Sequence, residues 1–507
     1  MPKLVQKDGR FALMVDGAPF LVLGGQANNS SNYPSVLPKV WPAIDKMQAN
    51  TLAMPVAWEQ IEPQEGKFDF TWVDLLVTEA RAHHKRLDLL WFGSWKNNGP
   101  QYAPEWVKLD TERFPRVINA EGRKMGSMSP FGADSLAADR KAFVTLMTHL
   151  KQIDPQHTVI LVQVQNEPGT YGSVRDYGPA AEKAFRGPVP QALVQGLGKT
   201  PGTWSDVFGD DAEEFFHAWH VARYINEIAA AGKAVYDLPL YVNASLRDPL
   251  HAQKPSSYES GGATYNVLPI YKIAAPAIDF IGPDIYSSNY PEYIAHLDRY
   301  HRPDNAMFVT ETGNGADYAR FFFAVLGHQG IGFSPFGIDY TKYVNYPLGA
   351  PKFDPEDVEP FALNYALVTP MMRELARLSF AGKLWGMAEP VAEHQQTIAL
   401  GKWRATLSYG LGQFGGGQPP GNAKPDGGAL IAELGPDEYL VAGFHVRVSL
   451  SLAEGHPGQQ GQLVRVEEGH FDQGQWLFER VWNGDQVDYG LNFTSVPQVL
   501  RVRLASF

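Results

Sequence analysis

The chain contains no cysteine, which excludes disulfide bonds, thiolate metal ligands and a cysteine nucleophile. It also lacks any apolar run close to the roughly 18–20 residues of a membrane span, and its first residues contain no apolar core of signal-peptide length. The sequence therefore predicts a protein with no membrane partner. It is most simply cytoplasmic, or periplasmic or secreted if a leader has been removed.

Positive charge is scarce as well. The formal net charge is −12 at pH 7, and Lys and Arg form no dense cluster. A surface that binds nucleic acid needs such a cluster to displace counterions from phosphates, so we expect no nucleic-acid partner. Aromatic residues are plentiful by contrast, with 12 Trp and 22 Tyr. Their flat apolar rings can stack on sugars, although most will fill the core.

Short apolar runs alternate with helical stretches over the first three hundred and more residues, after a lead-in with hairpin turns at Asp8-Gly9 and Asp16-Gly17. This rhythm is typical of βα units, and eight strands favour a (β/α)₈ TIM barrel over a doubly wound sheet. The strands are expected at 20–25, 51–58, 87–93, 158–165, 240–244, 279–286, 306–311 and 330–337. Long connections at about 94–137 and 168–210 follow strands, so we expect them at the rim of the barrel mouth.

From about Gly382 the pattern changes to alternating segments separated by Gly, Pro and Asp. We therefore expect two domains: a catalytic barrel at 1–381 and a smaller all-β, sandwich-like domain at 382–507. Composition predicts a flexible loop at 412–428. Exposed edges of such β modules can pair with one another, so a homo-oligomer is possible.

Two acidic residues stand at predicted strand ends. Glu167 follows Asn166 at the tip of the fourth strand, and Glu311 ends the seventh. The carboxyl ends of barrel strands face the substrate cleft, and paired carboxylates are the minimal apparatus for glycoside hydrolysis. We assign Glu167 as the acid/base and Glu311 as the nucleophile. Asn166 is expected to bind a sugar hydroxyl or the nucleophile, and Tyr286, at the tip of strand six, is expected to hold Glu311 ionised.

The stretches FALMVDGAPFLVLGG, WEQIEPQEGKFDFTWVD, QNEPG, IGPDIY and TETGNG resemble those of glycoside hydrolase clan A, and most of all the β-galactosidases of family 35. The bacterial members of that family carry a β module after the barrel. The resemblance implies retention of anomeric configuration and action on terminal non-reducing β-galactose in an oligosaccharide, polysaccharide or other glycan. It also implies that no metal or organic cofactor takes part.

Two regions depart from the family pattern. Family members carry Ala-Glu-Trp after strand three, where this chain has Gly93-Ser94-Trp95, and the sugar-contacting Tyr after strand two is absent here. Trp58, Trp95 and Asn97 are the candidates for replacement sugar contacts. These departures keep open the same chemistry on a β-glucoside, a β-fucoside or an α-L-arabinoside.

Other readings of the residues are also open. The chain could be a sugar-binding protein without catalysis, and a metal-dependent barrel hydrolase is a more distant alternative. His217 and His220 lie three apart on a predicted helix, but no third ligand accompanies them, so helix packing is the favoured interpretation. Glu62 is expected to anchor a loop through backbone amides.

Overall fold

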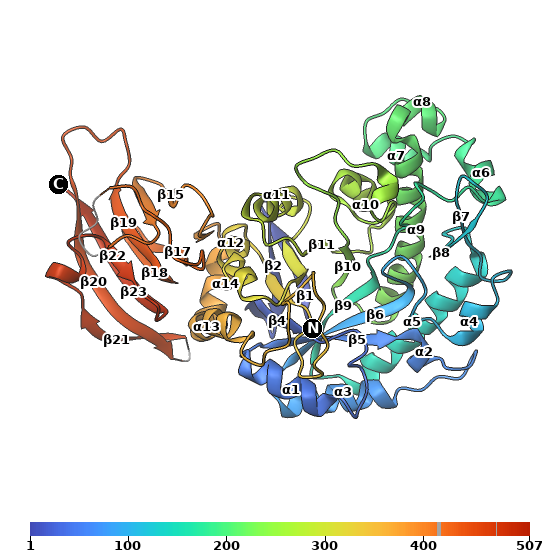
Figure 1. Ribbon diagram of the computed structural model, residues 1–507, viewed down its shortest axis with the longest axis horizontal. Helices are drawn as coiled ribbons and strands as arrows, with labels where there is room; N and C mark the ends of the chain where they lie inside the picture. Colours follow the sequence, from blue (N-terminus) through green and yellow to red (C-terminus); the bar gives the residue numbers. More distant parts are fainter. Residues whose placement is uncertain (413–416, 473) are drawn as a thin grey trace.

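Eight parallel strands form a closed barrel in the computed structural model, which describes residues 1–412, 417–472 and 474–507 (Figure 1). The barrel order is β10-β11-β12-β13-β4-β5-β6-β9. The strands are β4 (Val22–Gln26), β5 (Thr51–Ala57), β6 (Arg86–Lys96), β9 (Val159–Asn166), β10 (Leu240–Ala244), β11 (Phe280–Ile285), β12 (Phe308–Thr312) and β13 (Gly332–Pro335). Each overlaps one predicted strand, and the predicted (β/α)₈ barrel is confirmed.

The barrel strands are apolar along nearly their whole length because both of their faces are covered. Inside the barrel, Leu90, Phe92, Tyr241, Phe280 and Phe308 belong to one buried cluster that fills its lower part. Side chains on the outer faces join a second and larger cluster with the surrounding helices. The interior is therefore a packed core, and space for a ligand can occur only above it.

The helices that surround the barrel follow the predicted alternation with two exceptions, α2 and α10. The unpredicted helices α2 (Trp58–Ile61) and α10 (Leu268–Ala274) have only four and seven residues, so they are too short to show an amphipathic period. The other α-helices outside the long connections are α1 (Leu37–Lys46), α3 (Thr71–Ala82), α5 (Ala133–Ile153), α9 (Ala212–Val235), α11 (Tyr290–Tyr300), α12 (Phe321–Gly327), α13 (Glu359–Val368) and α14 (Met372–Phe380).

Both predicted hairpin turns of the lead-in are present. The strands β1 (Lys3–Lys7), β2 (Arg10–Val15) and β3 (Ala18–Phe20) form a small antiparallel sheet. Asp8, Gly9, Asp16 and Gly17 all have positive φ, as two-residue hairpin loops of the primed type require.

The two long connections contain short elements of their own. Between β6 and α5 lie α4 (Glu105–Leu109) and the paired strands β7 (Arg116–Ile118) and β8 (Lys124–Met128). Between β9 and α9 lie α6 (Pro179–Phe185), α7 (Gln191–Gly196) and α8 (Trp204–Phe208). In Figure 1 these pieces lie at the end of the molecule opposite to the C-terminal strands.

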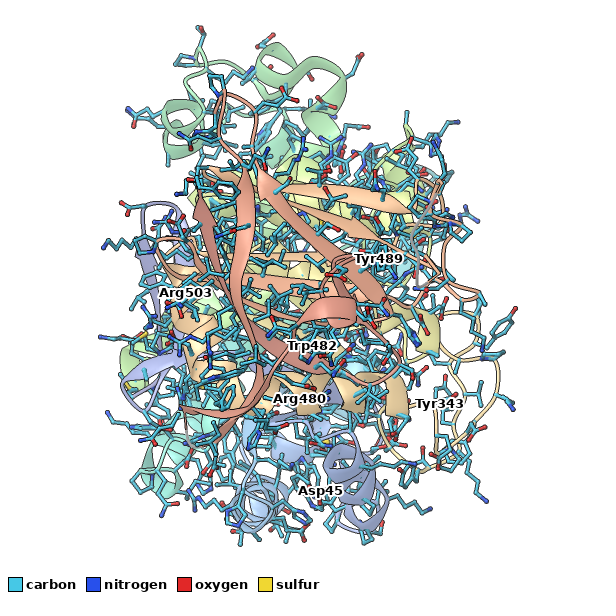
Figure 2. The ribbon with its side chains drawn as sticks, turned by 90° about the vertical axis from the view of Figure 1, so that its left-hand side faces the viewer. Asp45, Tyr343, Arg480, Trp482, Tyr489 and Arg503 are labelled. Carbon is cyan, nitrogen blue, oxygen red and sulfur yellow. The ribbon has the colours of Figure 1, made fainter. Side chains whose placement is uncertain are left out.

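The C-terminal region is all β, as expected, and consists mainly of two antiparallel sheets that enclose a separate apolar cluster. One sheet has the order β14-β17-β18-β23-β20-β21 and the other β15-β16-β19-β22. Their strands are β14 (Leu384–Ala388), β15 (Gln395–Leu400), β16 (Trp403–Ser408), β17 (Gly428–Gly435), β18 (Glu438–Phe444), β19 (Val446–Leu452), β20 (Gly461–Asp472), β21 (Gln475–Val481), β22 (Leu491–Phe493) and β23 (Gln498–Ser506). Figure 2 shows this module from its outer side, with Arg480 and Arg503 on the six-stranded sheet.

The division at 381/382 stays a prediction, since β14 begins two residues later and also packs on the barrel. Of the expected loop at 412–428, residues 413–416 lie outside the described residues. The described remainder has no strand before β17.

The C-terminal module packs tightly on the barrel through α12 and β14. The rings of Phe323 and Phe444 are 6.0 Å apart across this junction. A Cβ atom on Gly386 would lie only 2.1 Å from the backbone oxygen of Phe323, and one on Gly327 only 2.1 Å from that of Gly386. Glycine is therefore required for the two backbones to approach this closely. Within the described residues, no helix has both the length and the apolar character to cross a membrane.

Candidate active site

A cavity of about 850 Å³ opens at the carboxyl ends of the barrel strands. Glu167, Asp284, Tyr286 and Glu311 line it together with Asn97. These residues come from four different strands or from the turns that follow them. Closing the sheet into a barrel brings them to one place although they are far apart in the sequence.

Glu311 is held by three hydrogen-bond donors. Its Oε1 accepts from Gln26 Nε2 at 2.9 Å and from Asn166 Nδ2 at 3.3 Å. Its Oε2 accepts from the hydroxyl of Tyr286 at 2.7 Å. The side chain is almost fully buried, at 3% exposure. Three donors on one buried carboxyl group fix the direction of both of its oxygens.

Glu167 lies in a different environment. Its backbone has a positive φ of 42°, and its N–H donates to Asn243 Oδ1 at 2.8 Å. This strained conformation is fixed by the neighbouring strand β10, and strain of this kind often occurs at functional sites. Burial raises the pKa of Glu167 to about 8, helped by repulsion from Glu311 and opposed by the ammonium group of Lys96. Glu167 therefore keeps a proton at neutral pH, as a general acid must.

A third acid, Asp284, comes from β11, which lies between β10 and β12 in the barrel. In the register of β11 with β12, Asp284 is directly opposite Glu311. Asn243 Nδ2 donates to Asp284 Oδ2 at 2.6 Å, and Thr310 Oγ1 donates to Oδ1 at 2.7 Å. One oxygen from each of the three acids lies within 4.8 Å of one from each of the others. Burial and repulsion from Glu311 and Glu167 raise the pKa of Asp284 above its ordinary range.

Lys96 supplies positive charge beside these acids. Its Nζ donates to Asn166 Oδ1 at 2.8 Å and also to the side chain of Asn97. This bond fixes the amide of Asn166 so that its Nδ2 points at Glu311. Sequence reasoning missed Lys96, Asp284 and Gln26. The signal available for all three was a polar side chain at or near the end of an apolar strand.

The predicted sugar-contact residues separate into two groups. Asn97 is exposed and lines the cavity, and Asn166 and Tyr286 contact Glu311 as expected. Trp58 and Trp95 are fully buried and do not line the cavity. Trp58 Nε1 donates to Glu62 at 2.9 Å, and the ring of Trp95 packs edge-on against Tyr224 of α9. Both indoles therefore belong to the core, and we correct the expectation that they contact sugar.

The residues interpreted as structural are placed as such. Glu62 accepts hydrogen bonds from Gly66 N and from Trp58, so it anchors the turn. His217 is buried in α9 and contacts Thr170, and the ring of His220 packs at a tilt against Phe131. Burial lowers the pKa of each histidine to about 3, so both are neutral packing groups.

By distance alone, the three acids could also surround a cation. However, the oxygens of Glu311 and Asp284 already accept hydrogen bonds from amide and hydroxyl groups, and the Lys96 ammonium group is nearby. These hydrogen bonds occupy lone pairs that an ion would need, and the ammonium group already supplies positive charge beside the acids. We therefore describe the three acids as hydrogen-bonded groups and assign no metal to them.

Two family models match parts of this chain. Residues 39–234 match Glyco_hydro_42, described as beta-galactosidase. This segment of the barrel is thus similar to glycoside hydrolase family 42. It includes Glu167 and ends before Glu311. Residues 361–494 match a domain of unknown function, DUF5597. The match indicates family 42, and none of the comparisons supports the expected family 35.

The chain is also similar to curated β-galactosidases. It is 23% identical over 289 residues to Beta-galactosidase BgaA of Thermus sp, which covers 52% of this chain and 42% of that protein. A β-galactosidase of Thermus thermophilus is 22% identical with the same coverage. The chain thus spans less than half the length of these relatives.

Solved structures agree on the architecture. The β-galactosidase of Bacillus circulans sp. alkalophilus superimposes with a TM-score of 0.54 at 11% identity, covering 96% of this chain and 99% of that one. The enzyme of the psychrophilic Marinomonas ef1 gives 0.52 at 12% identity, covering 71% and 61%. At these identities the likeness shows the fold, namely a barrel followed by β structure.

Proposed function

We propose that this chain is a retaining, exo-acting β-galactosidase. The observation that carries the proposal is the pair of acids at the barrel mouth, whose closest oxygens lie within 4.8 Å. Retaining enzymes hold their two carboxyl groups about 5–5.5 Å apart, whereas inverting enzymes need about 6.5–9.5 Å to fit a water between them. The proton on Glu167 and the three donors to Glu311 support the same division of roles.

In the first step, Glu311 attacks the anomeric carbon while Glu167 gives its proton to the glycosidic oxygen. The bond from the sugar to the leaving group breaks, and a covalent glycosyl ester forms on Glu311. The Tyr286 hydroxyl at 2.7 Å keeps Glu311 oriented for this attack. In the second step, the ionised Glu167 removes a proton from water, which hydrolyses the ester and restores both residues.

The preference for galactose is the finer part of the proposal. It is supported by the family 42 match and by relatives that are named β-galactosidases. One observation keeps other sugars as a second candidate. Ser94, near the carboxyl end of β6, directs its Oγ toward the helices, 2.7 Å from Asp139 and 2.7 Å from Tyr224. This position therefore offers no contact to galactose, so a β-glucoside, β-fucoside or α-L-arabinoside is the alternative substrate.

A panel of nitrophenyl glycosides tests the proposal. We expect the highest kcat/KM on the β-galactoside, and proton NMR of the first product should show the β anomer. Faster hydrolysis of another glycoside would show that its sugar, and not galactose, is the preferred substrate. An α anomer as first product would exclude the retaining mechanism. Binding of galactose without cleavage of any member would favour a sugar-binding protein.

A further inference from the structure

We propose that Arg247 forms an anion-binding subsite of the cavity and binds a carboxylate or sulfate group on the leaving-group sugar of the substrate. This inference rests on the proposed function, because it names a substrate class for the same cavity, namely galactosides of acidic sugars. Its basis is a guanidinium group that lines the cavity and has no acidic partner among the described residues.

Two tyrosine rings hold the side chain of Arg247. Its Cζ atom lies 5.1 Å from the centroid of the Tyr258 ring and 5.2 Å from that of the Tyr265 ring. Tyr258 is buried, and its hydroxyl donates to Glu214 Oε1 at 2.6 Å. The Tyr265 hydroxyl donates to the backbone oxygen of Asp248 at 3.3 Å. Both rings are therefore fixed, and cation–π contacts with them orient the guanidinium group without using its N–H donors.

The N–H donors of Arg247 have no acceptor in the described part of the chain. The guanidinium group forms no ion pair or hydrogen bond there, and its Nε is buried without a partner. A guanidinium group presents its donors in a planar fork, which matches the oxygens of a carboxylate or another oxyanion. A buried donor without a partner is costly, and a ligand oxyanion would supply the acceptor that the chain does not.

The other basic side chains on the cavity wall are already engaged or neutral. Of the described Lys and Arg residues, Lys96 and Arg247 line the cavity. Lys96 donates to Asn166 and Asn97, so its charge is used beside the catalytic acids. His296 also lines the cavity, and burial lowers its pKa to about 4. Arg247 is therefore the cation of the described cavity wall that is left for a ligand.

The acidic groups on the same wall do not neutralise Arg247. Asp248 accepts from two backbone N–H groups of its own turn, at 2.8 and 2.9 Å. Glu292 accepts from the hydroxyl of Ser287 at 2.6 Å. Glu259 lines the cavity as well, but it forms no ion pair with Arg247. Because these carboxylates repel an anionic ligand, the cavity needs a cation such as Arg247 to bind one.

The position of Arg247 indicates which part of the substrate it contacts. It follows β10, whose neighbour β9 in the barrel leads directly into Glu167. The loops after these two strands are joined, because Thr170 N donates to Ser260 O at 2.9 Å and Ser260 N donates to Thr170 O at 3.1 Å. A general acid protonates the oxygen of the leaving group. A side chain beside the loop of that acid therefore contacts the leaving sugar.

Galactosyl disaccharides test the subsite. The probes carry glucose, glucuronic acid or sulfated glucose as the second sugar, with galactose β-linked in turn to each of its hydroxyls. We expect wild type to cleave the best acidic disaccharide with a kcat/KM about tenfold or more above that of its neutral counterpart, as one charge-assisted fork contact allows. This preference should disappear in Arg247→Gln. The better of the two acidic probes identifies the anion.

Arg299→Gln is the matched control. The Arg299 guanidinium group lies 4.8 Å from the centroid of the same Tyr265 ring, but the side chain is exposed and does not line the cavity. Its preference should equal that of wild type. Arg247→Lys should retain only part of the preference, because an ammonium group keeps the charge and loses the fork.

Two results would overturn the inference directly. One is a wild type that cleaves neutral disaccharides as well as acidic ones or better. The other is an equal loss of kcat/KM on neutral and acidic probes in Arg247→Gln, which would show that Arg247 only supports its loop through the two tyrosine rings.

Calorimetric titration of Glu311→Gln separates the inference from the proposed function, because it measures binding without turnover. We expect the acidic disaccharide to bind more tightly than the neutral one, and this difference to vanish when Arg247→Gln is added. Such binding together with a wild type that cleaves no glycoside would leave the subsite standing and refute the proposed function. Cleavage of the disaccharides without a charge preference in either measurement would refute the subsite alone.

Discussion

The barrel mouth and the junction between the barrel and the C-terminal module both bury acidic side chains, but they treat them differently. At the junction, Glu389 is fully buried and accepts from Asn422 N at 2.8 Å, from Asn422 Nδ2 at 2.7 Å and from Gly427 N at 3.0 Å. At the mouth, the carboxyl group of Glu167 lies beside two further acids, Asp284 and Glu311. Buried carbonyl oxygens of Asn28 and Asn29, on the cavity wall, have no hydrogen-bond partner.

This difference separates groups that hold the fold from groups that await a substrate. A buried polar atom without a partner costs about 1–3 kcal/mol, and on the cavity wall a ligand could supply the missing hydrogen bond. At the junction, both carboxyl oxygens of Glu389 accept hydrogen bonds from groups of the chain itself. We therefore expect substitutions at the mouth to affect chemistry, and substitutions at the junction to affect stability.

The largest effect should follow from Glu311→Gly at the mouth. Loss of the nucleophile should lower kcat on an aryl β-galactoside by about five orders of magnitude. Azide should restore part of the turnover and give the α-galactosyl azide, because the small anion fits the space of the missing side chain. The measurement is initial rate with and without azide. Full activity of the variant would exclude Glu311 as the nucleophile.

The isosteric variant Glu311→Gln is the control for folding. It removes like-charge repulsion from Glu167 and Asp284, which offsets the hydrogen bonds that its NH₂ group can no longer accept, so its thermal midpoint should be close to that of wild type. A lower midpoint would mean that Glu311 supports the fold in the way that Glu389 does.

Gly386→Ala at the junction should instead lower stability and leave the chemistry unchanged. The new Cβ would lie 2.1 Å from the backbone oxygen of Phe323, far below any van der Waals contact, so α12 and β14 would have to separate. We expect a loss of about 3 kcal/mol in stability, seen as a lower thermal midpoint, with kcat per folded molecule unchanged. Gly435→Ala is the control, because a Cβ there meets nothing within 4 Å. Equal midpoints for the two variants would contradict the packing of this junction.

The difference between these two regions also explains which features could be predicted from the sequence. The barrel strands were predictable because strands buried on both faces are continuous apolar runs. The places of Glu167 and Glu311 at the barrel mouth could be predicted because both residues stand at the ends of predicted strands. Asp284 was not recognised as a site residue, since its contacts in the site include the amide of Asn243 on another strand. Trp58 and Trp95 were misplaced because their positions near strand ends did not reveal that their side chains face the helices.

Glu389→Gln should cost less than the clash at Gly386. The amide keeps one acceptor oxygen but turns an NH₂ group toward donors, so one or two charge-assisted bonds are lost. We expect a loss of about 2 kcal/mol and unchanged kcat/KM. Glu393→Gln serves as the matched control, since Glu393 is close in sequence and exposed. A similar change in both variants would show that the buried bonds of Glu389 contribute little.

The last effect is a pH dependence of stability at the mouth. The pKa of Glu167 is raised from its ordinary value of 4.5 to about 8 in the folded protein. Between these values the folded chain holds a proton that the unfolded chain has released, so stability falls as pH rises, by at most about 1.4 kcal/mol per pH unit for one proton. Glu167→Gln has no such proton and should lose less. The thermal midpoint of the variant, relative to that of wild type, should therefore rise from pH 5 to pH 8. Parallel midpoints across this range would show that Glu167 ionises alike in both states, which would remove the physical basis for its role as the acid.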